Sequence, residues 1–164
     1  MVTSSTLKVG GGGTRIKSLF PLIACESIDC VAVQQLLLET VASAAVGRSL
    51  NERERKALRV ASESATRAAE QQGRVAHVGD VTHFLLEPIE QSMPGISGAD
   101  VLADWGRDVA FALERLVTEE LAGLIDGPTS EGVNVSGALT VFDLSSLPDG
   151  GAAVGTMMSV LHTW

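Results

Sequence analysis

Residues 49–72 read SLNERERKALRVASESATRAAEQQ, and this stretch predicts a capped amphipathic helix. Ser49 and Glu52 have the spacing of a capping box, in which the serine hydroxyl accepts from the backbone N–H of Glu52 and the carboxylate reaches back to the cap. We expect the helix to end at about Gln72, with i,i+4 charges on a solvated face and small residues on the opposite face, which permits close packing. The expected charge pairs are Glu52 with Lys56, Arg59 with Glu63 and Glu63 with Arg67, and the small-residue face is Leu58, Ala61, Ala65, Ala68 and Ala69.

Helical periodicity continues on both sides of this stretch. Residues 28–46 place their apolar side chains near one face, and Gly47 stands where a left-handed residue ends a helix. Asp80 is expected to cap a shorter helix that stops at Pro88. The longest helix is predicted over residues 100–125. The apolar faces are Val31, Leu37, Leu38, Val41 and Ala45 in the first helix, Val81, Phe84, Leu85 and Leu86 in the short helix, and Leu102, Trp105, Val109, Leu113, Leu116, Val117, Leu121 and Leu124 in the longest.

Short strands are predicted near both ends of the chain. Residues 6–9 favour a strand before the glycines at 10–13, and residues 14–20 favour a second extended piece. Residues 139–143 (LTVFD) predict a buried strand that ends in a carboxylate. A last helix is expected after residue 151, with Val154, Met157, Met158, Leu161 and Trp164 on its apolar face. Since this helix lacks a C-cap and a polar tail, we expect the chain to be cut from a longer protein.

These elements predict a mainly α fold, a bundle-like subdomain of four to five helices with short β segments at the N- and C-terminal ends. We divide the chain into three segments. Residues 1–20 are an extended segment of a parent core, and residues 21–128 are an all-helical subdomain. Residues 129–164 are a loop, a strand and a truncated helix that return to the parent core. Aromatic residues make up only 4% and Tyr is absent, so the core must be built from Ala, Leu and Val. Such a core suits packed helices better than a β-sandwich.

The charge balance argues against nucleic-acid partners. The chain has 12 Lys and Arg against 20 Asp and Glu, a net charge of −8, whereas phosphate binding needs clustered positive charge. No apolar run approaches the roughly 20 residues that span a bilayer, and the N-terminus lacks the charged and apolar regions of a signal peptide. We therefore expect neither direct nucleic-acid binding nor membrane insertion.

The glycine cluster is a near miss for a phosphate-binding loop. From Gly11 the sequence reads GGGTRIKS, which places Lys17 and Ser18 as the pattern G-x-x-x-x-G-K-[ST] requires. Ile16 replaces the second glycine, and a β-branched residue disfavours the positive-φ turn needed there. Pro21 also prevents a long helix from starting at Lys17. We therefore assign no nucleotide site to this loop.

Asp143, at the end of the C-terminal strand, resembles the acid of a Walker B strand, which orients magnesium. That acid follows four apolar residues, and Thr140 interrupts the run here. The favoured interpretation is therefore an ordinary strand-end Asp that caps the following turn.

The cysteines and histidines form no set with ligand or catalytic spacing. Cys25 and Cys30 have no neighbouring His or further Cys to complete a metal site, and we interpret them as reduced thiols of a cytoplasmic protein. His77, His83 and His162 have no spacing typical of a shared metal or a catalytic group.

Two further features have ordinary explanations. Asn134-Val135-Ser136 fits the N-glycosylation pattern, but nothing else indicates secretion. Trp105 is interpreted as a core anchor of the longest helix. The sequence therefore gives no catalytic, cofactor-binding or metal-ligating residue.

Five segments carry a family resemblance that covers about residues 7–164. They are 49–58 (SLNERERKAL), 77–86 (HVGDVTHFLL), 105–109 (WGRDV) with Leu113, 123–129 (GLIDGPT) and 139–145 (LTVFDLS). In order, they resemble a helix after a leucine-(Ser/Thr)-x-x-Glu start, the short helix that follows, a long helix, its closing loop and the core strand before Walker B. The family is that of the conjugative-transfer and type IV secretion ATPases, in the FtsK-like branch of the RecA-type P-loop motors.

The resemblance implies a parent that hydrolyses ATP with Mg to power DNA or protein transfer. In that family an all-helical insertion lies between Walker A and Walker B, so the chain would hold none of the ATP-binding residues and would be no enzyme by itself. Its implied partners are the rest of the parent ATPase and neighbouring subunits or secretion-machine proteins. The implied location is the cytoplasm, with the parent at the inner face of the cell membrane.

Two other hypotheses stay open. The chain could be a self-standing helical protein–protein interaction module with no ATPase connection. It could also be a small enzyme whose site the sequence does not reveal.

Overall fold

The computed structural model describes residues 4–8, 28–89, 98–122, 139–143, 147 and 152–163. Along the chain they form β1 (Ser4–Lys8), α1 (Ile28–Val46), α2 (Glu52–Gln71), α3 (Val78–Leu86), α4 (Ala99–Arg115), the π-helical turn η1 (Leu116–Glu120), β2 (Leu139–Asp143) and α5 (Ala152–Thr163). The predicted mainly α fold is therefore confirmed for the described part of the chain.

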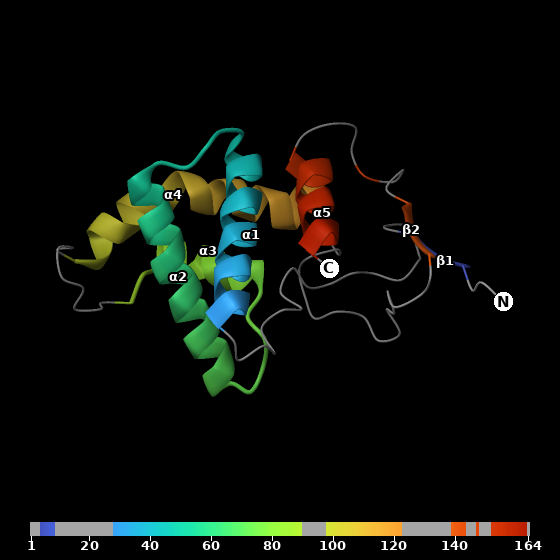
Figure 1. The fold of residues 1–164 in the computed structure, drawn as a ribbon. Helices are drawn as coiled ribbons and strands as arrows, with labels where there is room; N and C mark the ends of the chain where they lie inside the picture. Colours follow the sequence, from blue (N-terminus) through green and yellow to red (C-terminus); the bar gives the residue numbers. More distant parts are fainter. Residues whose placement is uncertain are drawn as a thin grey trace.

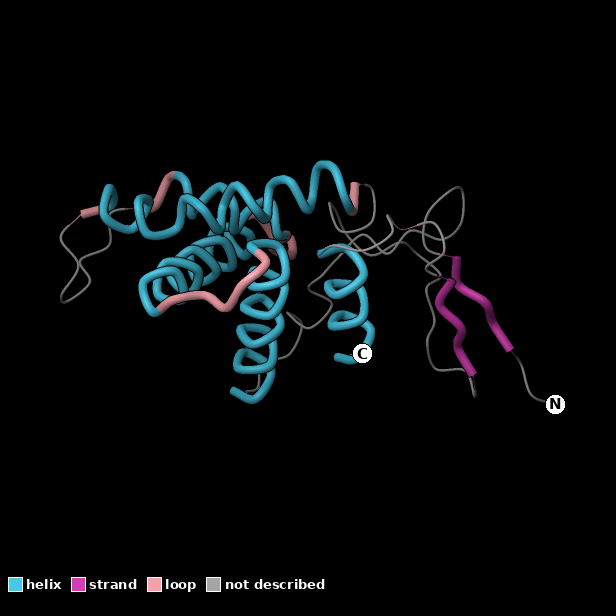
Figure 2. The backbone as a smooth tube through the Cα atoms, turned by 90° about the horizontal axis from the view of Figure 1, so that it is seen from above, coloured by secondary structure: helices cyan, strands magenta, loops and turns pink. Residues whose placement is uncertain are grey.

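Helix α4 organises the packing of the other helices. It crosses behind α1 and α2 in Figure 1 and runs along one side of the bundle in Figure 2, in contact with α1, α2 and α3. Helix α5 packs against α1 and η1. The fully buried Leu58, Leu85 and Leu113 come from α2, α3 and α4, so these three helices share the centre of the core.

Small residues let α4 approach its neighbours closely. Gly106 of α4 is buried, and a Cβ at this position would lie 2.7 Å from Cδ2 of Leu85 and 3.4 Å from Cβ of Ala57. The predicted small face of α2 is confirmed, because Leu58, Ala61, Ala65 and Ala69 are buried and only Ala68 is half-buried. The close contact therefore depends on small side chains on both helices.

The predicted apolar faces are largely confirmed. Buried members are Leu37, Leu38, Val41 and Ala45 of α1, Val81 and Leu85 of α3, Leu102, Val109, Leu113, Leu116 and Leu121 of the longest helical segment, and Met157 of α5. Trp105, Val117, Phe84 and Val154 are half-buried against the core. Leu86 and Met158 are exposed, so their assignment to a core face was wrong. The side chains of Val31, Leu124, Leu161 and Trp164 lie outside the described residues.

Both predicted N-caps were wrong by two or three residues. Asn51, not Ser49, caps α2, and its Oδ1 accepts from the backbone N–H groups of Arg53 (2.9 Å) and Glu54 (3.0 Å). His77, not Asp80, occupies the cap position of α3. The physical reason is the same at both helices, since the acid that reaches back to the cap stands at the third helical position, as Glu54 and as Asp80.

The longest helix does not remain α-helical to residue 125. It changes at Leu116 to a π turn, in which the N–H of Leu121 donates to the carbonyl of Leu116 (2.8 Å). In an α-helix these two leucines would point about 140° apart, yet both are fully buried, and the wider turn accommodates them. Arg115 stabilises the change, because it pairs with Glu120 (3.3 Å) and donates to the carbonyl of Ala45 (3.2 Å) at the end of α1.

The predicted i,i+4 charge pairs of α2 were also wrong. Glu52 pairs instead with Arg55, three residues away, and none of the three predicted pairs reaches ion-pair distance among the described side chains. The charges of this face line a groove, which is described below.

The two strands pair with each other in parallel. Ser4 lies opposite Leu139 and Lys8 opposite Asp143. The C-terminal strand has its predicted bounds, and the N-terminal strand begins at Ser4 where residues 6–9 were expected. In Figures 1 and 2 the pair lies beside the helices, and no described helix covers it. The extended piece predicted at 14–20 lies outside the described residues.

Gly106→Ala should lower the free energy of unfolding by roughly 0.5–2 kcal/mol, because overpacking the contact with Leu85 costs roughly 1–3 kcal/mol and better helix propensity offsets roughly 0.5–1 kcal/mol of that loss. Gly155→Ala in α5 is the matched control, since nothing lies within 4 Å of a Cβ there. It should raise stability by roughly 0.5–1 kcal/mol through better helix propensity. Urea unfolding followed by circular dichroism measures both. A Gly106→Ala variant at least as stable as the wild type would contradict the close-packing account.

Candidate functional site

The two connections that flank α2 share one sequence pattern. Residues 47–54 read GRSLNERE and residues 73–80 read GRVAHVGD, so that each has Gly-Arg, a cap residue three positions after the arginine, and an acid three positions after the cap. We name them the first and second Gly-Arg turns. Each turn joins the end of one helix to the first turn of the next.

The glycine of each turn ends the preceding helix. Gly47 has φ +77° and Gly73 has φ +66°, the left-handed region that favours glycine. The next N–H then reaches back to the helix, from Arg48 to the carbonyl of Ser43 (3.2 Å) and from Arg74 to the carbonyl of Ala69 (3.0 Å). This is the Schellman arrangement, which satisfies the last carbonyls of the helix and places the arginine at the start of the turn.

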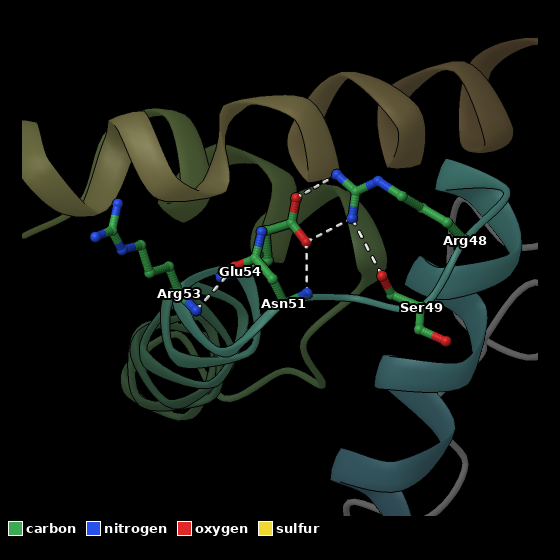
Figure 3. A network of polar contacts seen from close by, with 5 residues as sticks. All are labelled: Arg48, Ser49, Asn51, Arg53 and Glu54. Atoms are coloured by element: carbon green, nitrogen blue, oxygen red, sulfur yellow. Dashed lines mark hydrogen bonds and ion pairs between the residues drawn. The ribbon is translucent and has the colours of Figure 1, made fainter.

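In the first turn the arginine holds a buried carboxylate, as Figure 3 shows. Glu54 is only 4% exposed, and its two oxygens accept from the guanidinium of Arg48 at 2.6 and 2.8 Å. The same carboxylate accepts from the backbone N–H of Asn51 (2.8 Å), while Arg48 also donates to the carbonyl of Ser49 (3.2 Å). The carboxylate therefore links the end of α1 to the start of α2.

The second turn repeats these contacts. Both oxygens of Asp80 accept from Arg74 at 2.7 Å, and Oδ2 also accepts from the backbone N–H of His77 (2.7 Å). Arg74 donates to the carbonyl of Val75 (3.3 Å), as Arg48 does to Ser49. One difference stands out, because Nδ1 of His77 is buried and has no hydrogen-bond partner in the described part of the chain. The second cap is therefore less complete than the first.

The pKa of each acid is lowered in the folded chain. The hydrogen bond from Arg48 is the main cause that lowers the pKa of Glu54. Burial of the carboxylate acts in the opposite direction, but the Asn51 N–H and the positive charge of Arg48 lower the pKa further. Burial raises the pKa of Asp80, but the hydrogen bonds from Arg74 and from the His77 N–H outweigh it, so that the pKa is lowered. Each turn therefore contributes stability through a charged carboxylate.

A groove runs between α1 and α2. Its main part encloses about 730 Å³ and adjoins, at Arg59, a smaller hollow of about 370 Å³. The α2 wall is one helical stripe from Glu52 to Glu70, and α1 supplies the opposite wall. The lining residues are Glu52, Arg55, Lys56, Arg59, Ser62, Glu63, Thr66, Arg67 and Glu70 of α2, and Ala32, Gln34, Gln35 and Glu39 of α1.

The described lining of the groove is mainly polar and charged. Among these described residues, acids and bases are equal in number, with Glu39, Glu52, Glu63 and Glu70 against Arg55, Lys56, Arg59 and Arg67. Ala32 is the one apolar side chain among the described lining residues. A volume in the range of ligand pockets, about 300–1,000 Å³, can admit several side chains of a partner.

The residues considered for chemistry are not brought together. Lys17, Ser18, Cys25 and Asn134 lie outside the described residues, and the side chains of Cys30, Asp143 and His162 are likewise not described. His77 caps α3, whereas His83 is exposed on the same helix with its ring 5.2 Å from that of Phe84. The described residues contain no group of three His, Cys, Asp or Glu that could hold a metal.

Trp105 is half-buried against the core, and the guanidinium of Arg53 lies 5.7 Å from its ring centroid. The core-anchor interpretation is thus confirmed, with an added cation–π contact between α2 and α4. Sequence reasoning missed the Gly-Arg turns, although the repeated pattern of Gly-Arg and a later acid could have revealed them. It also missed the groove, which requires α1 to be placed beside α2.

Comparison with protein-family models, with curated proteins and with solved structures gave no significant match. None of the described helices combines the length and the apolar character needed to cross a bilayer.

Glu54→Gln should lower the free energy of unfolding at neutral pH by roughly 1–3 kcal/mol, because it removes the charge-assisted hydrogen bonds from Arg48. The effect should be smaller than for a fully buried ion pair, since the Arg48 side chain is half-exposed. The pKa of Glu54 is lower in the folded than in the unfolded chain. The stabilisation by the ionised Glu54 carboxylate is thus fully present at pH values above its unfolded-state pKa of about 4.3. This stabilisation is lost as the pH falls through the folded-state pKa.

Urea unfolding of both proteins at a series of pH values tests this. The difference between wild type and Glu54→Gln should stay constant down to about pH 5 and shrink below it. Glu63→Gln, at an exposed position of the same helix, is the matched control and should change stability by less than about 0.5 kcal/mol. A Glu54→Gln effect that persists unchanged to strongly acidic pH would exclude the ionised pair as its cause.

Proposed function

We propose that this chain is the helical subdomain of a conjugation- or type IV secretion-like ATPase that powers DNA or protein transfer. Besides the resemblance of the sequence segments, one structural observation supports the proposal. Strands β1 and β2, which precede and follow helices α1–α4 along the chain, pair in parallel with Ser4 opposite Leu139.

This pairing favours an insertion into a larger sheet. Parallel strands occur almost only in sheets whose two faces are covered by helices, and a lone two-stranded ladder has little stability of its own. The described ladder has two strands and no described helix over its faces. Further parallel strands of a parent core would complete it, and α1–α4 would then be an excursion between two neighbouring strands.

On this proposal the helices serve as a packing surface rather than a catalytic one. ATP and Mg would be bound by the parent, and the chain alone would hydrolyse nothing. The helices would contact the motor core, neighbouring subunits or secretion-machine proteins, in the cytoplasm at the inner face of the membrane. The net charge of −8 supports protein rather than nucleic-acid contacts.

A self-standing helical interaction module is the second candidate. The exposure of large apolar side chains favours it, with Leu36 66% and Phe111 55% exposed. Aromatic side chains such as Phe111 are enriched at protein–protein interfaces. This candidate requires no parent sheet around β1 and β2.

The coding sequence around the chain separates the two candidates. The motor proposal predicts a Walker A motif encoded upstream of Met1 and a Walker B acid soon after Trp164, in one reading frame. An in-frame stop just after Trp164, together with no phosphate-binding loop upstream, would contradict the motor and leave the interaction module.

Calorimetric titration of the isolated chain with Mg·ATP tests whether the chain alone binds nucleotide. We expect no binding heat, because the nucleotide-binding residues would lie in the parent. Lys17→Ala is the control variant. Micromolar binding that disappears in this variant would contradict the proposal and restore residues 11–18 as a phosphate-binding loop.

A further inference from the structure

The π turn after α4 brings together two pairs of side chains that an α-helix would separate. Leu116 and Leu121 are both fully buried, and Nε of Arg115 lies 3.3 Å from Oε1 of Glu120. The members of each pair are five positions apart in the sequence, a spacing that places side chains about 140° apart in an α-helix. Continuation of α4 as an α-helix would therefore turn Leu121 away from Leu116 and break the Arg115–Glu120 pair.

Two registers are available to the backbone of this segment. In the observed register the N–H of Leu121 donates to the carbonyl of Leu116, and in an α-helix the same N–H would donate to the carbonyl of Val117. The backbone keeps its hydrogen bonds in both registers, so side-chain contacts decide between them. Single π turns within α-helices occur frequently at functional sites.

Helix α5 packs on the elements that meet at this turn. It contacts η1 and α1, and Figure 1 shows it beside α1. Arg115 joins the same two elements, because it pairs with Glu120 of η1 and donates to the carbonyl of Ala45 at the end of α1 (3.2 Å). The surface on which α5 packs is therefore formed by α1 together with η1 in its π register.

The docked position of α5 leaves a polar group unsatisfied. Thr156 is fully buried, and its hydroxyl has no hydrogen-bond partner among the described residues. Water would satisfy this hydroxyl after undocking, so the hydroxyl disfavours the docked state. Gly155 beside it has open space at the Cβ position and lowers the helix propensity of α5. Docking of α5 is therefore weaker than the burial of its apolar side chains alone would make it.

We propose that the π turn Leu116–Glu120 is a register switch that docks and releases α5. In the π register α5 is docked, as observed. In the α register Leu121 leaves its buried position, the Arg115–Glu120 pair is broken, and α5 leaves the bundle. Packed elements with two discrete arrangements are a common basis of conformational switches.

Release of α5 changes how the strands are attached to the helices. Because α5 follows β2 along the chain, its undocking removes one attachment between the strand pair and the bundle. The inference does not depend on the motor proposal, since it uses only contacts within the chain.

Two adjacent methionines of α5 report its release. Met157 is 0% exposed and Met158 is 57% exposed. Hydrogen peroxide oxidises an accessible thioether to the sulfoxide, so Met158 reacts in both states and Met157 only while α5 is undocked. Mass spectrometry with fragmentation between the two residues gives the ratio of their oxidation rates. For the wild type we expect a Met157/Met158 ratio of roughly 0.001–0.1, the population of a minor conformation.

Substitutions should change this ratio in opposite directions. Glu120→Gln should raise it roughly two- to fivefold, because it removes a partly exposed ion pair that only the π register makes. Glu119→Gln, at an exposed position of the same turn, is the matched control and should leave the ratio unchanged. Thr156→Val should lower the ratio roughly tenfold, since it keeps the shape and removes the unsatisfied hydroxyl from the docked state.

Deletion of Thr118 tests the coupling to the register. With one residue fewer, Leu121 follows Leu116 by four positions, so both leucines stay buried in a continuous α-helix and α5 keeps its packing surface. Glu120→Gln should no longer change the ratio in this shortened chain, because no second register remains. Circular dichroism should show native helix content for the shortened chain, and its failure to fold would also contradict the account.

Hydrogen exchange separates local release from global unfolding. The amides of α2 and α3 should keep their wild-type protection in Glu120→Gln, while those of α5 lose protection. A parallel loss of protection in α2, an unchanged oxidation ratio in Glu120→Gln, or an equal rise in the chain without Thr118 would each overturn the proposal. Failure here would leave the coding-sequence and ATP tests of the motor unaffected.

Discussion

The ion pair between Glu54 and Arg48 is the interaction on which the arrangement of the helices depends. A carboxylate that is 4% exposed must keep a partner, because an unpaired buried charge costs several kcal/mol. Arg48 follows the last turn of α1, and Glu54 lies in the first turn of α2, so the pair fixes the direction in which α2 leaves α1. The groove between these helices follows from that direction, and so does the surface on which α4 packs.

The second Gly-Arg turn applies the same constraint between α2 and α3. Arg74 and Asp80 reproduce the bidentate contact, and Gly73 reproduces the left-handed helix end. With α2 and α3 fixed in this way, α4 crosses both at Gly106, where a side chain would collide with Leu85. The described helices thus form a bundle held by two polar turns and one close helix contact, which we propose to be the helical subdomain of a larger motor, with a self-standing interaction module as the alternative.

Much of the fold could be predicted from apolar periodicity, because the burial of one helix face is a local property. Helix α1 has its predicted bounds, and the small face of α2 is buried as expected. The cap of α2 was misplaced because Ser49 with Glu52 and Asn51 with Glu54 both satisfy the capping-box spacing. The nearby Arg48 favours the second pair, since it binds the Glu54 carboxylate, and the prediction did not take this contact into account. The π turn at Leu116 and the groove depend on where other helices lie, which no local pattern contains.

Reciprocal exchange of the two cap residues tests the claim that the two Gly-Arg turns, each built around its Arg–carboxylate pair, share one structure that Asn51 completes and His77 leaves incomplete. Asn at position 77 can accept from the helix N–H groups that His77 leaves without a side-chain acceptor. The account predicts that His77→Asn raises the free energy of unfolding by roughly 0.5–1 kcal/mol and that Asn51→His lowers it by about 1 kcal/mol. Loss of stability in both variants, or no loss in Asn51→His, would contradict it.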